Sequence, residues 1–250
     1  MSEYRTMGAV IIGDELLSGK RRDRHLSHLI EVLGRRGVQL AWCRYEGDDG
    51  MRLAQALRQT RDSGVPVFCF GGIGSTPDDC TRLAAAQAFD APLVRHPGVV
   101  ALIEAQFGEQ AYPVRIHMAD LPEGCALVPN PWNRIPGFSL QHHHFFPGFP
   151  QMAWPMLDWV LQNRYPGTYA VVSEYAVRVP DVRESDLCEL METLSARHLQ
   201  ARLFSLPHLG AENHVELGFR GEAGAAGEAF ADLLRELDSR GFRYSHTGAD

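Results

Sequence analysis

The stretch that decides the fold is Val65–Arg82, which reads VPVFCFGGIGSTPDDCTR. Its first six residues form an apolar run that is typical of a parallel strand buried on both faces. Gly71, Gly72 and Gly74 follow directly, and a helical pattern begins near Thr81. A buried strand that passes through a glycine turn into a helix predicts an α/β sheet with a ligand loop at the strand's carboxyl end.

The residues before this stretch repeat the same alternation. Met7–Ile12 and Val38–Tyr45 read as strands, whereas Arg24–Arg36 and Met51–Ser63 carry apolar side chains at helical spacing. Strands that alternate with helices predict a parallel sheet covered on both faces. We therefore expect an α/β protein whose first domain is a three-layer α/β/α structure with a mostly parallel sheet.

Shorter elements complete this first domain. The sequence predicts helices at Thr81–Phe89, Val99–Phe107 and Met152–Leu161, and strands at Ala126–Val128, Phe138–Leu140 and His143–Phe146.

A different pattern follows Asn163–Gly167, which reads as a linker. The predicted order is a strand at Tyr169–Val179, a helix at Glu184–Arg197, strands at Arg202–Leu206 and His214–Phe219, and a helix at Gly227–Arg240. This order favours a small α+β domain with helices on one face of an antiparallel sheet. We expect domain boundaries at 1–164 and 168–250, and we expect the second domain to serve dimerisation of a homo-oligomer.

Composition narrows the class of partner. The net charge of −7 argues against nucleic acid, because a phosphate backbone demands a basic surface. No apolar run reaches the length of a membrane span, and the N-terminus lacks the pattern of a signal peptide. The five cysteines are scattered without CxxC spacing, which favours reduced thiols. We therefore expect a cytoplasmic protein that binds a small molecule.

Two loops leave predicted strands with groups suited to a phosphate-bearing ligand. Glycine lets backbone amides approach an anion, and hydroxyl groups add donors. The next helix offers its positive end. The candidate ligand-binding residues are Gly13, Asp14, Glu15 and Ser18 in the first loop, and Gly71, Gly72, Ile73, Gly74, Ser75 and Thr76 in the second.

Acids beside these loops leave alternatives open. Asp78 and Asp79 would repel phosphate unless a divalent cation lies between them and the ligand, or unless one acts as a base. They could also simply cap the helix that follows. Lys20–Arg24 reads either as a solvated helix start or as a phosphate-facing patch. His142–His144 alternate faces in a strand, so they cannot all bind one ion.

Collinear motifs give the sequence a family resemblance. They are IIGDELLSG (Ile11–Gly19), EGDD (Glu46–Asp49), GGIGSTPDDCTR (Gly71–Arg82), LPEGCALVPNP (Leu121–Pro131), IPGF (Ile135–Phe138) and FPGFP (Phe146–Pro150). With these motifs the first domain resembles the MoaB/Mog family of molybdopterin-binding domains, and most closely the N-terminal part of the competence-damage-inducible CinA family. The tail resembles the small KH-like or ferredoxin-like domain that follows in CinA.

The resemblance implies a ligand and a site. Molybdopterin or a nucleotide would be held by the two loops and by Pro147 and Gly148. Asp48 and Asp79 match the functional acids of the pterin-handling relatives. CinA-type domains also cleave the pyrophosphate of ADP-ribose with a divalent metal, so Asp78 and Asp79 would hold Mg, Mn or Co.

The sequence also departs from the CinA pattern. PGFPQMA replaces the usual PGVPREM at Pro147–Ala153, which puts hydrolase activity in doubt, and a sequence ending at Asp250 predicts no nicotinamide-mononucleotide deamidase activity. The main hypothesis is a protein that binds a phosphate-bearing pterin or nucleotide. The alternatives are a metal-dependent ADP-ribose pyrophosphatase and a non-catalytic, nucleotide-responsive interaction module.

Overall fold

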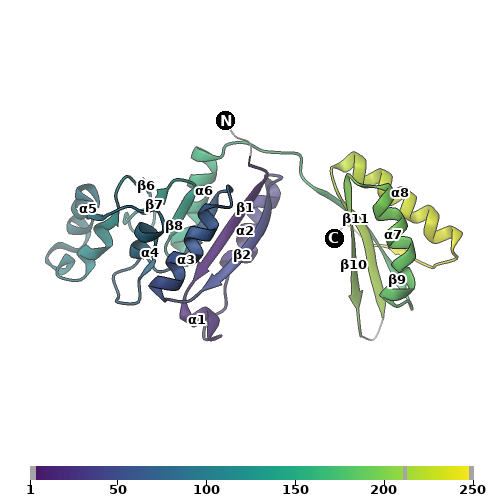
Figure 1. Ribbon diagram of the computed structural model, residues 1–250, viewed down its shortest axis with the longest axis horizontal. Helices are drawn as coiled ribbons and strands as arrows, with labels where there is room; N and C mark the ends of the chain where they lie inside the picture. Colours follow the sequence, from purple (N-terminus) through teal and green to yellow (C-terminus); the bar gives the residue numbers. More distant parts are fainter. Residues whose placement is uncertain (1–3, 211–212, 248–250) are drawn as a thin grey trace. The chain divides into compact units, whose positions relative to one another are not determined.

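The computed structural model describes residues 4–210 and 213–247, and its contacts divide the chain into two compact units, Met1–Tyr169 and Ala170–Asp250 (Figure 1). Each unit has a hydrophobic core of its own.

The first unit is built on a sheet with the strand order β2-β1-β3-β8-β7-β6. Four strands run parallel to one another, namely β2 (Gln39–Glu46), β1 (Thr6–Ile12), β3 (Val67–Phe70) and β8 (His143–Phe146). The strand β7 (Gly137–Leu140) is antiparallel to β8, and β6 (Ala126–Val128) is antiparallel to β7. The prediction of a mostly parallel sheet is confirmed.

Helices cover both faces of this sheet, as Figure 1 shows. On one face α2 (His25–Arg35) and α6 (Pro150–Arg164) share a core with Ala9 and Ile11 of β1. On the other face α3 (Gly50–Arg61) and α4 (Thr81–Ala88) pack with Val10 and Ile12, since successive side chains of a strand point to opposite faces. The apolar run of a doubly covered strand follows from this arrangement.

Several short elements were not predicted. They are α1 (Asp14–Leu17), the ribbon of β4 (Leu93–Arg95) with β5 (Asp120–Pro122), and the 3-10 turns η1 (Gly108–Ala111) and η2 (Arg115–Ala119). The predicted helix α5 (Pro97–Phe107) packs with these turns. Segments of three to five residues are too short to show a hydrophobic period.

The parallel strands deliver their loops to one edge of the sheet. The amide of Gly13, after β1, donates to the carbonyl of Glu46 at the end of β2, at 3.0 Å. The amide of Gly71, after β3, donates to the carbonyl of Phe146 at the end of β8, at 2.9 Å. These bonds fix the loops after β1 and β3 side by side with those after β2 and β8.

The second unit contains an antiparallel sheet with the order β10-β11-β9-β12. Its strands are β9 (Ser173–Pro180), β10 (Ala201–His208), β11 (His214–Gly221) and β12 (Ser245–His246), and its helices are η3 (Glu184–Leu187), α7 (Cys188–Arg197) and α8 (Ala223–Ser239). The core lies between the helices and one face of the sheet. The first strand begins at Ser173, not at Tyr169 as predicted, and β12 was missed because two residues carry no pattern.

Within residues 4–210 and 213–247, no helix combines the length and apolar character that crossing a membrane requires.

Candidate functional site

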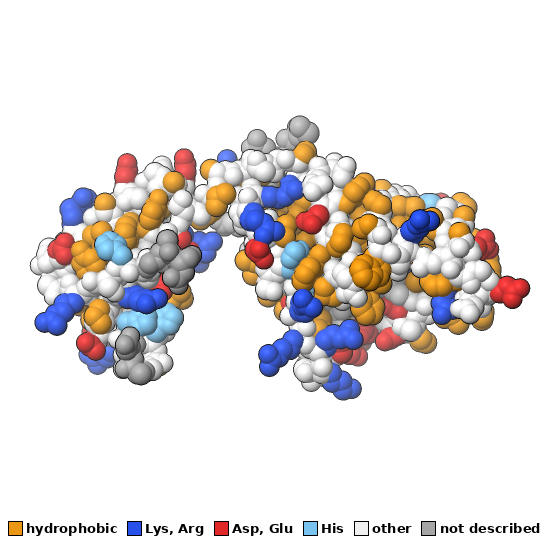
Figure 2. All heavy atoms as spheres, turned by 180° about the vertical axis from the view of Figure 1, so that it is seen from behind, with side chains coloured by type: hydrophobic (Ala, Val, Ile, Leu, Met, Phe, Trp, Pro, Cys, Tyr) orange, Lys and Arg blue, Asp and Glu red, His pale blue; other side chains and the backbone are white. Residues whose placement is uncertain are grey.

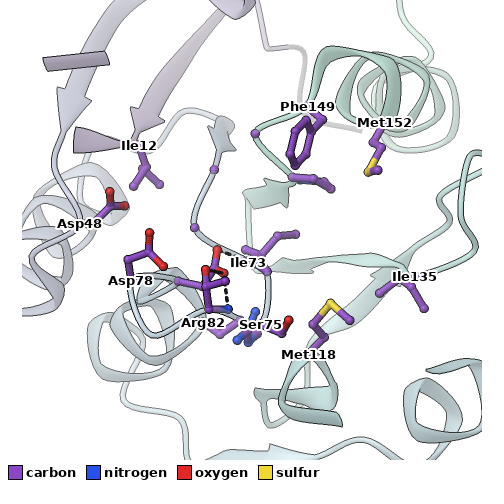
Figure 3. Close-up of a pocket in the computed structure, with 18 of the residues that line it drawn as sticks. Ile12, Asp48, Ile73, Ser75, Asp78, Arg82, Met118, Ile135, Phe149 and Met152 are labelled. Carbon is purple, nitrogen blue, oxygen red and sulfur yellow. Dashed lines mark hydrogen bonds between the residues drawn. The ribbon is translucent and has the colours of Figure 1, made fainter. Parts of the chain in front are cut away.

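A cavity of about 420 Å³ opens at the carboxyl edge of the main sheet (Figure 3). The predicted residues that line it are Gly13, Glu15, Asp48, Gly71, Gly72, Ile73, Gly74, Ser75, Thr76, Asp78, Asp79, Pro147 and Gly148. Asp14 and Ser18 do not line this cavity; they line a neighbouring hollow that shares Glu15, Asp48 and Asp78 with it. The segment after Gly13, which was predicted to be a turn, forms the short helix α1 instead.

The glycine loop after β3 is held by contacts that exclude larger residues. Gly71 and Gly72 have φ angles of 109° and 68°, which L side chains rarely adopt. A Cβ on Gly72 would also overlap the hydroxyl of Thr81. That hydroxyl donates to the Gly71 carbonyl at 3.0 Å, and the Thr81 amide donates to the Gly72 carbonyl at the same distance. Buried Thr81 therefore ties the loop to the first turn of α4.

Asp79 closes the same loop from its other end. Its Oδ1 accepts from the Gly74 amide at 2.7 Å, and its Oδ2 accepts from the Thr76 amide at 2.8 Å and from the Thr76 hydroxyl at 2.6 Å. The side chain therefore bonds to residues before it in the chain and does not cap the following helix as one alternative suggested. Its oxygens are engaged in shaping the loop, so we assign Asp79 a positioning role; its catalytic and metal-binding roles stay predictions.

Amides of the loop are available to a ligand. The amides of Gly72, Ile73 and Ser75 donate to no acceptor among the residues that the structure describes, and all three residues line the cavity. Backbone amides gathered in a glycine turn form a concave surface that binds anions.

Asp48 and Asp14 join the loops after β2 and β1. The Asp14 amide donates to Asp48 Oδ2 at 2.9 Å, and the Asp48 amide donates to Asp14 Oδ1 at 3.2 Å. Burial raises the pKa of Asp48 above its ordinary value, and the charges of Asp14, Glu15 and Asp78 raise it further. The hydrogen bond from the Asp14 amide lowers the pKa and so opposes these effects. Asp14 thus contributes by positioning Asp48, whose carboxylate lines the cavity.

Arg82, which was not singled out from the sequence, provides positive charge. It is 7 % exposed and lines the cavity from the first turn of α4. Its Nη1 atom is buried without a hydrogen-bond partner among the described residues. Burial lowers the pKa of Arg82, which nearby Asp79 and Asp120 partly oppose. A buried guanidinium nitrogen without a partner is costly, and an anionic ligand oxygen would satisfy it.

The opposite wall of the cavity is apolar. Figure 3 shows Asp48 and Asp78 on one side, Met118 and Ile135 on the other, with Arg82 and Ser75 between them. Further apolar residues complete this wall, namely Leu121, Phe138, Phe149 and Met152. Phe149 is 49 % exposed although its ring is large. Leu121, Phe138 and Met152 come from β5, β7 and α6, so the residues of this wall meet only through the tertiary fold.

The consecutive histidines have structural partners. His143 bonds to the Thr60 hydroxyl at 2.9 Å on one face of the sheet, whereas His144 bonds to Ser139 at 2.7 Å and to Tyr165 at 2.9 Å on the other. None of the three lines the cavity. The prediction that they cannot share one ion agrees with this alternation.

No three His, Cys, Asp or Glu side chains in the described ranges are grouped closely enough to form a metal site by themselves. A divalent cation here would need ligands from the bound molecule. Mg²⁺ in proteins is usually held in that way, by one or two carboxylates together with substrate phosphates.

Residues 8–166 match the family described as probable molybdopterin binding domain. The chain belongs to this family. The match spans the main sheet of the first unit except the first two residues of β1, every loop that lines the cavity, and helix α6.

Two related proteins are both described as CinA-like. The chain is 32 % identical over 202 residues to a CinA-like protein of Gemmatimonas aurantiaca, covering 74 % of this chain and 46 % of that protein. It is 36 % identical over 129 residues to a CinA-like protein of Gloeobacter violaceus, covering 50 % of this chain and 30 % of that protein. The chain thus spans less than half the length of these relatives.

A solved structure shares the fold. The crystal structure of CinA from Thermoplasma acidophilum, a protein of unknown function, aligns with a TM-score of 0.60 at 24 % identity, covering 65 % of this chain and 99 % of that one. The molybdopterin-binding-type fold and the similarity to CinA predicted from the motifs are therefore confirmed.

Proposed function

We propose that the first unit binds a phosphate-bearing pterin or nucleotide in the cavity at the carboxyl edge of its sheet. The observation that carries the proposal is Arg82, a buried guanidinium whose Nη1 has no partner among the described residues. It lies beside the unengaged amides of Gly72, Ile73 and Ser75. Guanidinium groups and glycine-turn amides are the usual partners of phosphate in proteins.

The two sides of the cavity suit the two parts of such a ligand. The phosphate would lie at the glycine loop and Arg82. A flat, aromatic ring would lie against the apolar wall, where Phe149 is half exposed and Met118 and Met152 offer polarisable sulfur. A cavity of about 420 Å³ lies within the usual range for binding sites of small molecules.

The test replaces Arg82 by methionine. The apolar side chain keeps the length of arginine but removes an unpartnered buried charge, so we expect the variant to be folded and at least as stable as the native protein. Affinity for AMP and for molybdopterin, measured by isothermal titration calorimetry, should fall by at least about tenfold, because charge-assisted hydrogen bonds are lost.

Arg35→Met is the matched control. Arg35 lies on α2, is exposed, pairs with Glu31 and does not line the cavity. Its substitution should leave both affinities unchanged. Equal affinities for the Arg82 and Arg35 variants would contradict the proposal, as would a native protein that binds neither ligand.

A second candidate function is the metal-dependent cleavage of ADP-ribose. The observation that favours it is the gathering of Glu15, Asp48 and Asp78 in the wall of the cavity, with Asp14 bonded to Asp48 behind them. Burial raises the pKa of Asp48, and the charges of Asp14, Glu15 and Asp78 raise it further. Asp48 and Asp78 would hold the cation, which would neutralise phosphate charge. The glycine-loop amides would stabilise the charge that develops when water attacks phosphorus and AMP and ribose 5-phosphate separate.

Phosphorus NMR of ADP-ribose with the protein and Mg²⁺, Mn²⁺ or Co²⁺ tests this activity. The two monophosphate signals should appear only with metal, and they should fade in Asp48→Asn and Asp78→Asn but not in the distant Asp62→Asn. An unchanged pyrophosphate spectrum with all three metals would exclude cleavage and would leave a binding protein or a nucleotide-responsive interaction module.

A further inference from the structure

A second cavity of about 220 Å³ adjoins the first. The two share Ile12, Glu15, Arg21, Gly148 and Phe149 in their walls. The guanidinium of Arg21 lies 6.0 Å from the centre of the Phe149 ring, so these two side chains form the partition. The far wall of the second cavity is the start of α2.

The basic cluster Lys20–Arg24 supplies the charge of this second cavity. Arg21, Arg22 and Arg24 line it. Arg21 has a distant carboxylate partner in Glu15, at 3.6 Å, whereas neither Arg22 nor Arg24 forms an ion pair with any described residue. The guanidinium of Arg24 instead lies 5.4 Å from the ring centre of Trp154.

The acid within the cluster, Asp23, forms no ion pair with these arginines. Asp23 Oδ1 accepts from the His25 amide at 2.9 Å, and its Oδ2 accepts from the Leu26 amide at 3.0 Å and from the Tyr45 hydroxyl at 2.9 Å. Asp23 therefore caps α2 with both oxygens, and the guanidinium groups of Arg22 and Arg24 are left for an external anion.

His25 adds an unsatisfied polar atom to the same wall. The residue is 5 % exposed and its ring stacks on Phe70 at 4.5 Å. Its Nε2 bonds to the Gly148 carbonyl at 3.1 Å, and a carbonyl can only accept, so Nε2 carries the proton. Burial lowers the pKa of His25, which keeps the ring neutral and makes Nδ1 an acceptor. Nδ1 is buried without a partner among the described residues.

We propose that the second cavity is a subsite for a sugar phosphate or a similar phosphorylated, hydroxyl-bearing group of the ligand. Arg22 and Arg24 would bind its phosphate, and a hydroxyl group would donate to His25 Nδ1. The proposal rests on the proposed function, because the same ligand would enter the first cavity past Arg21 and Phe149. It assigns the basic cluster at Lys20–Arg24 to ligand recognition, as the phosphate-facing patch that the sequence allowed and not as a solvated helix start.

Isothermal titration with ribose 5-phosphate tests the subsite, because this probe carries a phosphate and hydroxyls but no ring for the apolar wall. The double variant Arg22→Ala/Arg24→Ala should bind it about tenfold or more weakly than the native chain. Arg82→Met and the control Arg35→Met should bind it within about twofold of the native affinity. AMP, which fits the first cavity, should show the reverse order, with its affinity lowered by Arg82→Met and kept in the double variant.

The outcomes separate the two proposals. Loss of ribose 5-phosphate binding in Arg82→Met, with full binding in the double variant, would overturn the subsite and leave the first cavity as the anion site. A native protein that binds AMP but not ribose 5-phosphate would overturn the subsite alone. Failure to bind AMP or molybdopterin would overturn the proposed function itself.

Discussion

Adjacent carboxylates at this site differ in their partners, and their effects on stability and binding should differ too. Asp79 accepts three hydrogen bonds from the glycine loop, whereas its neighbour Asp78 is exposed at the mouth of the cavity. Asp49 accepts from the amides of Met51 and Arg52 and caps α3, whereas its neighbour Asp48 faces the cavity. Both pairs read as Asp-Asp in the sequence. The sequence does not distinguish their members, because the hydrogen-bond partners of each side chain depend on how the loop folds.

The first prediction concerns the pair at the glycine loop. Asp79→Asn should lower the free energy of unfolding of the first unit by about 1–3 kcal/mol, because an amide cannot accept all three bonds of the carboxylate. Its affinity for AMP should fall even without metal, since the loop loses its shape. Asp78→Asn should leave stability within about 0.5 kcal/mol. Chemical denaturation followed by tryptophan fluorescence gives the first quantity. Equal stability of the two variants would show that Asp79 does not hold the loop.

A second prediction concerns Asp48 and pH. Its pKa in the folded protein lies above the ordinary 3.8, so the folded state holds this proton more tightly than the unfolded state does. The stability due to this group is therefore greatest below pH 3.8 and falls as the pH rises through the folded pKa. Asp48→Asn, which stays neutral, should be more stable than the native protein at pH 7, and the difference should shrink as the pH falls towards 3. Denaturation at several pH values measures it, with Asp62→Asn as the control. A constant difference would contradict the assigned charge effect.

At the scale of elements, the sequence was most informative where apolar runs were long. The strands β1, β2 and β3 and the helices α2 and α3 were predicted to within about two residues, because each must bury a face over several turns or residues. The helix α6 begins at Pro150, two residues before the prediction, because proline suits the first helical position.

The site was predicted only where local chemistry gave a signal. Glycines and acids next to strand ends identified the loops, since those residues are costly elsewhere. Arg82, Ile135 and Met152 were missed, because nothing in their neighbourhood along the chain indicates that they converge. Burial of an arginine in particular is decided by the tertiary fold.

The third prediction concerns the glycine loop as an element. Gly72→Ala should destabilise the first unit by about 2–4 kcal/mol, because it combines a positive φ with an overlap against Thr81 in a packed site. Gly64 follows α3 with a similar φ of 71° and open space around its Cβ position. Gly64→Ala should therefore lower the free energy of unfolding by only about 1–2 kcal/mol, since only the positive φ angle disfavours alanine there. Thermal melts followed by tryptophan fluorescence compare the variants, and equal losses would mean that Thr81 yields to the added methyl.

At the scale of the whole molecule, the chain holds three hydrophobic clusters, two in the first unit and one in the second, and no residue of these clusters is shared between the units. All four tryptophans, Trp42, Trp132, Trp154 and Trp159, lie in the first unit. Tryptophan fluorescence therefore reports only on the unit that carries the cavity, whereas far-ultraviolet circular dichroism reports on both. Assembly into a homo-oligomer, and any part of the second unit in it, stay predictions.

A charged cluster in the second unit contributes to the stability of that unit. Buried Asp232 accepts from His198 Nε2 at 2.9 Å and from Arg197 Nη1 at 2.7 Å, joining the end of α7 to α8. These bonds lower the pKa of Asp232 to about 2. Because its pKa is lowered, the ionised carboxylate stabilises the fold at pH values above its ordinary pKa of 3.8. This stabilisation is lost as the pH falls from about 4 to about 2.

The last prediction uses this cluster to separate the two units. Asp232→Ala should lower the free energy of unfolding of the second unit by about 1.5–3 kcal/mol at pH 7, because hydrogen bonds to charged groups are lost. The transition followed by circular dichroism should then split or broaden, while that followed by tryptophan fluorescence should stay where it is in the native protein. Gly72→Ala should do the reverse and shift the fluorescence transition. If Asp232→Ala moved both transitions together, the units would unfold as one cooperative body, and ligand binding in the first unit would be energetically coupled to the second.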